Sequence, residues 1–294
     1  MNHDIVSEIR AAANDKVREF LAGDSELGED ELATPESPGW HKPTDEIWTV
    51  NSEPALLMGG LASLMLQTLH PQVMAGVYDH SDYETDPLGR FQRTSRFVSA
   101  TTFARAEIAD GLVDQVNAIH KHITGTSEIG EPYKATDPHL LMWVHVTEVY
   151  CFWKSFVDYG PDVEVDVDAY VSQMGKTAIA LGVPEPPQTW TEVEETLSAY
   201  QYECFYGKQA AETMKYLLDP RSAPGVASAP YAIAIPAALR LLPLWARKLA
   251  EIPLLPVVTP LAVKPVAKVL AGTLRWIALD RVAELRAGAA ATGD

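Results

Sequence analysis

LLMWVHVTEVYCFWKSF, at residues 140–156, is the stretch that decides the fold class. On a helix it is apolar almost all round, with His145 and Glu148 three residues apart on one face, and such a helix is buried in a core. Outward from it, between Pro54 and about Tyr216, apolar residues recur at three- and four-residue spacing. Alternating strand patterns and an Asn-Gly hairpin signal are missing there. We therefore expect an all-α protein built around a single helical bundle.

Composition and charge exclude several classes of function. The chain has 294 residues, of which 47% are hydrophobic and 21% charged, as in ordinary globular proteins. Its 40 Asp and Glu against 23 Lys and Arg give a net charge of -17, the wrong sign for binding nucleic acid. With two cysteines, Cys151 and Cys204, it has neither a disulfide framework nor a thiolate cage for a metal. The charged N-terminus lacks a secretion signal and prolines or charges interrupt every apolar run, so we expect a cytoplasmic protein without a membrane span.

Three parts follow one another along the chain. Residues 1–53 are expected to form an N-terminal helix and an acidic linker, because residues 24–46 are rich in acids and prolines and poor in apolar residues. Residues 54–218 are the helical core. Residues 219–294 are apolar and basic, and their prolines predict short helical pieces that pack on the core and pair with its acids. A basic amphipathic tail that contacts a membrane is the less favoured alternative.

Helix ends are marked in the sequence. Asp137 followed by Pro138 is typical of an N-cap with proline in the first helical position. Gly125, Gly160 and Gly182 are typical of helix stops. The stretch at 140–156 is therefore expected to lie on a helix that begins at Pro138 and ends near Gly160.

The first candidate for chemistry is His120. Apolar residues recur around it at helical spacing: Ile108, Leu112, Val116, Ile119 and Ile123. His120 follows Val116 by four residues and is expected to point inward, whereas His122 is turned by about 200° and falls on the polar face. A hydrogen-bonded core histidine and a metal or haem ligand remain the two alternatives for His120.

A second group of candidates lies in GRFQRT, residues 89–94. If this segment is helical, Arg90 and Thr94 lie one turn apart with Arg93 beside them, so two guanidinium groups and a hydroxyl converge. Such a cluster binds anions. It either pairs with neighbouring carboxylates, or holds haem propionates or negative charge that develops on dioxygen.

Two further histidines need a role. His70 precedes Pro71 and either caps its helix or lies at the rim of a pocket. His145 and Glu148 are expected to be buried as a mutually hydrogen-bonded pair. A di-iron centre needs two Glu-x-x-His motifs, and the sequence has none. Zincin, nucleophile-elbow, phosphate-loop and dinucleotide-binding motifs are missing as well.

Four sequence blocks then stand in a familiar order: LLMGGLASLMLQTLHPQVMAGVYDHS (56–81), PLGRFQRT (87–94), VNAIHKHITG (116–125) and YKATDPHLLMWVHVT (133–147). Together they resemble the family of MpaB-type oxygenases and latex-clearing proteins, the rubber oxygenases. The resemblance implies an all-α fold loosely like a globin, a non-covalently bound haem b, and oxygen-dependent cleavage of carbon–carbon double bonds in isoprenoid chains. It also implies that His120 is the proximal iron ligand and that Arg90 and Thr94 belong to the distal side.

Two positions depart from the rubber oxygenases. Arg93 stands where they have a lysine that can cap the iron, and arginine is a poor iron ligand because it does not deprotonate. The region from Gln67 to Val77 holds no acid where they have a glutamate base. His70 is the candidate to replace that glutamate.

We therefore expect a haem b-dependent oxidoreductase that uses dioxygen to oxidise or cleave an apolar, isoprenoid-like unsaturated small molecule. The residues expected to bind the cofactor are Arg90, Arg93, Thr94, His120 and His145, with His120 on the iron. The residues expected to be catalytic are Arg93, Thr94 and His70. The alternative is a non-catalytic haem- or lipid-binding helical protein that associates peripherally with a membrane.

Overall fold

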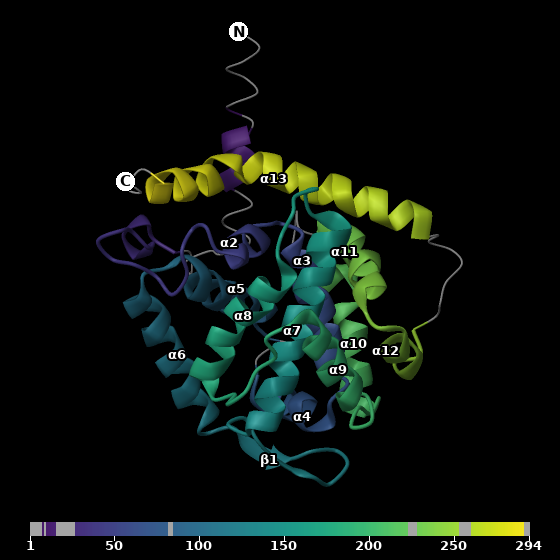
Figure 1. The fold of residues 1–294 in the computed structure, drawn as a ribbon. Helices are drawn as coiled ribbons and strands as arrows, with labels where there is room; N and C mark the ends of the chain where they lie inside the picture. Colours follow the sequence, from purple (N-terminus) through teal and green to yellow (C-terminus); the bar gives the residue numbers. More distant parts are fainter. Residues whose placement is uncertain are drawn as a thin grey trace.

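The all-α class is confirmed by the computed structural model of the chain, which describes residues 8, 10–15, 27–81, 85–222, 228–252 and 260–290. Helix α7 (Pro138–Tyr159) runs through the middle of the molecule (Figure 1). It begins as its sequence predicts, because the Asp137 carboxylate accepts a hydrogen bond from the backbone N–H of His139. It ends at Gly160.

Helices α3 (Leu56–Gln67) and α11 (Ser228–Leu241) pack around α7 and against each other. At Gly59 a Cβ atom would lie 2.9 Å from the carbonyl oxygen of Cys151 and 3.0 Å from the Cβ of Ser155. The missing side chain therefore lets α3 approach the backbone of α7 closely. Gly60 faces more open space, since its nearest neighbour would be the Phe152 ring at 3.9 Å.

The remaining elements surround this centre. They are α2 (Glu46–Asn51), α4 (Pro71–His80), α5 (Pro87–Phe103), α6 (Ala106–His120), β1 (Thr124–Thr126), β2 (Pro132–Lys134), α8 (Val167–Leu181), α9 (Trp190–Tyr200), α10 (Lys208–Leu217), α12 (Leu244–Leu249) and α13 (Pro260–Ala290), with short 3-10 turns at Glu29–Glu31 and Pro220–Ser222. Helices α5 and α6 are neighbours, and α6 also contacts α8. Residues 89–94 lie on α5, so the helix predicted for them is confirmed.

One small hairpin was not expected from the sequence. Strands β1 and β2 pair antiparallel over three residues each, with Gly125 opposite Tyr133. Gly125 is thus a strand residue, and the prediction that it stops a helix is wrong because α6 already ends at His120. A three-residue strand is too short to produce an alternating pattern. Gly182, in contrast, caps α8 in the left-handed conformation with φ 110°, as predicted.

The acidic segment before α2 is not a free linker over the residues described. Glu31 accepts a bidentate hydrogen bond from the Arg96 guanidinium at 2.7 and 3.2 Å, which lowers the pKa of this carboxyl. Backbone bridges join Leu32 to Ala104 and Gly39 to Arg105. Residues 27–46 therefore lie against the junction of α5 and α6. The Arg96 cation neutralises the charge of Glu31, and the backbone bridges hold the segment in place.

The C-terminal part covers one end of the bundle. Ala237 on α11 and Ala267 and Ala271 on α13 are fully buried in the same core cluster as α3 and α7. Lys264 and Arg275 bind the core acids Asp158 and Glu53, at 2.7 and 2.6 Å. The prediction of short pieces is wrong for residues 260–290, which form one continuous helix with Pro265 inside it.

Pro265 lacks the backbone N–H that would bond to the carbonyl of Leu261, so α13 continues through it with one hydrogen bond fewer. In the described part of the chain, every helix is too short or too polar to cross a bilayer.

Candidate functional site

His120 is the last residue of α6. Its side chain is half-buried, and its Nδ1 is buried without a hydrogen-bond partner among the described residues. Burial lowers the pKa of His120, so the ring is neutral at physiological pH. His122 is exposed, as the helical phase predicts, but Ile119 is 52% exposed and does not belong to the inward stripe. The buried face is formed by Ala109 and Val113.

Arg90 and Thr94 lie one turn apart on α5, where the Thr94 hydroxyl donates to the carbonyl oxygen of Arg90 at 3.1 Å. Arg90 is half-buried, and its Nη1 donates to the Ser81 hydroxyl at 2.7 Å. Arg93 is exposed and its Nη1 lies 3.1 Å from a carboxylate oxygen of Asp86, the N-cap of the same helix. This contact holds the pKa of Asp86 below its usual range. The Arg90 guanidinium thus reaches Ser81, that of Arg93 reaches Asp86, and the hydroxyl of the exposed Thr94 is bound to the backbone.

His145 and Glu148 do not form the expected hydrogen-bonded pair. His145 is buried, and its Nε2 has no partner among the described residues. Burial lowers the pKa of His145 to about 4 and raises the pKa of Glu148 to about 7. The predicted pair is therefore wrong, and because neither group has the other as a charge partner, burial favours the neutral form of each.

Helix α3 faces the turn of α7 that carries Glu148. The Gln67 amide donates to the hydroxyls of Ser63 and Thr147, at 2.9 and 3.2 Å. Gly60, two turns earlier, lies beside the ring of Phe152. Burial, and next to it the Glu148 carboxyl, raises the pKa values of Cys151 and of Tyr170 on α8, so this carboxyl lies near both side chains.

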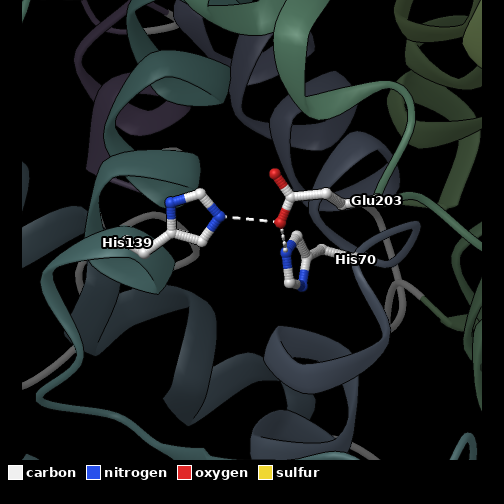
Figure 2. A group of neighbouring side chains, drawn as sticks. All are labelled: His70, His139 and Glu203. Atoms are coloured by element: carbon white, nitrogen blue, oxygen red, sulfur yellow. Dashed lines mark hydrogen bonds and ion pairs between the residues drawn. The ribbon is translucent and has the colours of Figure 1, made fainter.

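His70 joins two residues that the sequence did not single out. It is the N-cap of α4, and Figure 2 shows its ring and that of His139 directed at one oxygen of Glu203. The Nε2 of His139 lies 2.7 Å and the Nε2 of His70 3.6 Å from this oxygen. The rings of Trp143 and Tyr200 lie about 6 Å from that of His70, at 5.9 and 6.1 Å between centroids.

Among the described residues, the side-chain contacts of His70 run to α7, α9 and the turn at Glu203, and not to α5 or α6. The structure thus separates the predicted residues into groups: Arg90 with Thr94 on α5, His120 on α6, His145 within α7, and His70 with His139 and Glu203. His139 and Glu203 were missed because each stands alone in its sequence neighbourhood and only the fold brings them to His70.

Comparison with known proteins identifies the family. Searches of curated proteins and of solved structures find no match to this chain. The family model described as "ER-bound oxygenase mpaB/B'/Rubber oxygenase, catalytic domain" matches residues 47–278. This range begins in α2, ends within α13, and contains the four blocks on which the sequence resemblance rests. The chain therefore belongs to the mpaB/rubber oxygenase catalytic-domain family.

Proposed function

We propose that this protein is a haem b-dependent oxygenase that uses dioxygen to oxidise or cleave an apolar, isoprenoid-like unsaturated substrate. Membership of the oxygenase family supports the reaction class. The observation that carries the cofactor assignment is His120, whose buried Nδ1 has no hydrogen-bond partner among the described residues. Buried polar groups are rarely left unpaired, so this ring calls for a partner that the described residues do not supply.

The residues around His120 fit a haem. A histidine ligand must be neutral, and burial lowers the pKa of His120 below its usual value. Helix α5, which carries Arg90 and Thr94, packs beside the helix that ends at His120. When bound, haem supplies an iron centre at which dioxygen is activated.

Each residue of the proposed site has a distinct task. His120 would hold the iron. Arg90 stays positively charged when half-buried and offers donors to a propionate or to another anion. Thr94 would turn its hydroxyl from the carbonyl of Arg90 toward dioxygen or substrate. Arg93 is exposed and bound to Asp86, so we place it farthest from the iron, where a haem propionate would meet solvent.

His145 is the remaining cofactor-binding residue in the proposal. Its buried Nε2 lacks a partner among the described residues, and with a pKa of about 4 it stays neutral. A neutral ring in this position can donate or accept one hydrogen bond without adding charge to an apolar pocket. His70 is proposed as the catalytic residue that replaces the family's glutamate. Glu203, whose carboxylate oxygen lies 3.6 Å from the Nε2 of His70, would hold this ring in place.

The C-terminal helices support a substrate-covering role over membrane docking. Lys264 and Arg240 both approach Asp158, at 2.7 and 3.9 Å, and Arg275 binds Glu53. These cations are compensated within the molecule, so they are less available to anionic lipid. An apolar substrate would then reach the core beneath or beside α11 and α13.

Oxygen consumption tests the proposal. Purified full-length protein loaded with haem b is mixed with a short polyisoprene in an oxygen electrode, and the products are analysed for new carbonyl ends. We expect alkene-dependent oxygen uptake by the native chain and by His122→Ala, which alters an exposed neighbour, but none by His120→Ala. Haem retention without any alkene-dependent uptake would identify a carrier instead of an enzyme.

A further inference from the structure

We propose that His70, His139 and Glu203 form a binding site for one divalent transition-metal ion of the zinc type (Figure 2). This site lies on other elements than Arg90, Thr94 and His120, and it shares with the proposed oxygenase only His70 and the Glu203 that holds it. His70 comes from the N-cap of α4, His139 from the first turn of α7, and Glu203 from the turn after α9. An ion here would join three segments that are distant in the sequence.

The spacing of the three ligand atoms suits a metal. All of them lie within 4.8 Å of one another, and the Glu203 oxygen is 2.7 and 3.6 Å from the two imidazole nitrogens. Two ligand atoms on one tetrahedral zinc ion, each about 2.0–2.1 Å from the metal, are about 3.3 Å apart. Small side-chain rotations would bring the observed distances to that value.

Hydrogen bonding around His139 leaves its Nε2 as the metal-facing atom. The Tyr200 hydroxyl lies 2.7 Å from the carbonyl oxygen of His139, which can only accept, and 3.1 Å from the Nδ1 of the same residue. Because the Tyr200 hydroxyl donates its single proton to the carbonyl oxygen, it must accept a hydrogen bond from the Nδ1–H of His139. The Nε2 of a neutral His139 then carries a lone pair, which faces a carboxylate oxygen at 2.7 Å.

Two lone pairs at this distance repel each other unless a cation or a proton lies between them. A metal ion resolves the conflict, and Tyr200 then has the outer-shell role that commonly orients a ligating histidine. Protonation of His139 is the competing solution, and it gives a simple ion pair.

The surroundings of His70 favour a metal ion over a proton shared by His139 and Glu203. His70 is 1% exposed, and neither ring nitrogen has a hydrogen-bond partner among the described residues. The 3.6 Å separation from Glu203 is too long for a hydrogen bond. A proton shared by His139 and Glu203 would leave this buried imidazole unsatisfied, whereas a metal would bind it.

Exposure of the other two ligands leaves room for solvent on the ion. The side chains of His139 and Glu203 are 53% and 43% exposed, so a water molecule can complete the coordination. The backbone N–H of Phe205 donates to the carbonyl of Leu69 at 2.7 Å, which fixes the segment of Glu203 against that of His70. Two imidazoles, a carboxylate and a water form a set that zinc accepts readily.

Zinc binding by the full-length protein tests this proposal. The purified chain is freed of adventitious metal with a chelator, titrated with Zn²⁺ in a calorimeter, and analysed for bound zinc after gel filtration. We expect the native protein to bind one more equivalent than His139→Ala and Glu203→Gln. The exposed residues His122 and Glu195 provide matched controls, and His122→Ala and Glu195→Gln should bind zinc like the native protein.

Equal zinc stoichiometry and affinity in the native protein and in both ligand variants would overturn the proposal and leave an ion pair. Circular dichroism verifies that the variants keep their helices, which we expect because both changed side chains are partly exposed. The haem absorption band should be the same in both variants and in the native chain. Failure of the metal site would therefore be distinguishable from failure of the oxygenase proposal.

Discussion

Replacing Glu148 by glutamine should stabilise the protein at alkaline pH. Glu148 lies on the central helix α7, and burial raises its pKa from 4.5 to about 7. Glutamine keeps nearly the same shape and cannot ionise. The variant therefore removes the cost of a charge in the core and leaves the packing of α7 in place.

The size of the effect follows from the pKa. Below pH 4.5 both the folded and the unfolded chain carry a neutral carboxyl. As the pH rises, the unfolded chain releases its proton first, so the native protein loses stability until the pH passes about 7. The complete shift corresponds to about 3 kcal/mol, and we expect about 2 kcal/mol because solvent screens part of a half-buried group.

Urea denaturation of the native chain and of Glu148→Gln at pH 5 and pH 8 measures this difference. The variant should be more stable by about 2 kcal/mol at pH 8 and by less than a third of that at pH 5. An equal difference at both pH values, or a less stable variant at pH 8, would refute the reasoning and show that the carboxylate is stabilised by a partner.

Four further substitutions test packing, the C-terminal cover and the proposed role of Thr94. Gly59→Ala should cost about 1–3 kcal/mol in urea denaturation because its Cβ meets the backbone of α7, whereas Gly60→Ala should cost far less. Arg275→Ala should cost about 1–2 kcal/mol, since it leaves Glu53, 11% exposed, without its ion-pair partner; a loss near zero would mean that α13 is held by apolar contacts alone. Thr94→Val should slow oxygen uptake by up to about tenfold and keep the haem band, because it removes one hydrogen bond of about 0.5–1.5 kcal/mol; loss of the band would instead make Thr94 a haem-holding residue.

Much of the fold follows from local sequence signals. Asp137 and Pro138 begin α7 and Gly182 ends α8 because capping depends on a few consecutive residues. The helix at residues 89–94 and the buried Nδ1 of His120 follow from helical periodicity. Ile119 is exposed in spite of its apolar side chain, because an apolar residue near a helix end need not face the core.

Contacts between residues far apart in the chain explain the features that could not be predicted from the sequence. An acidic segment such as residues 27–46 is free or docked according to whether a cation such as Arg96 meets it, and that depends on the whole fold. The cluster of His70, His139 and Glu203 has no spacing motif, because its members come from three separate elements. The unpaired state of His145 and Glu148 depends in the same way on burial, which only the folded structure creates.

The absorption spectrum of the purified full-length protein with haem b tests the central claim most directly. We expect the native chain and His122→Ala to bind one equivalent with a Soret band of histidine-ligated haem, and His120→Ala to lose stoichiometric binding while its helix content stays nearly the same. A native Soret band in His120→Ala, or its loss in His122→Ala, would contradict the assignment of His120 as the iron ligand.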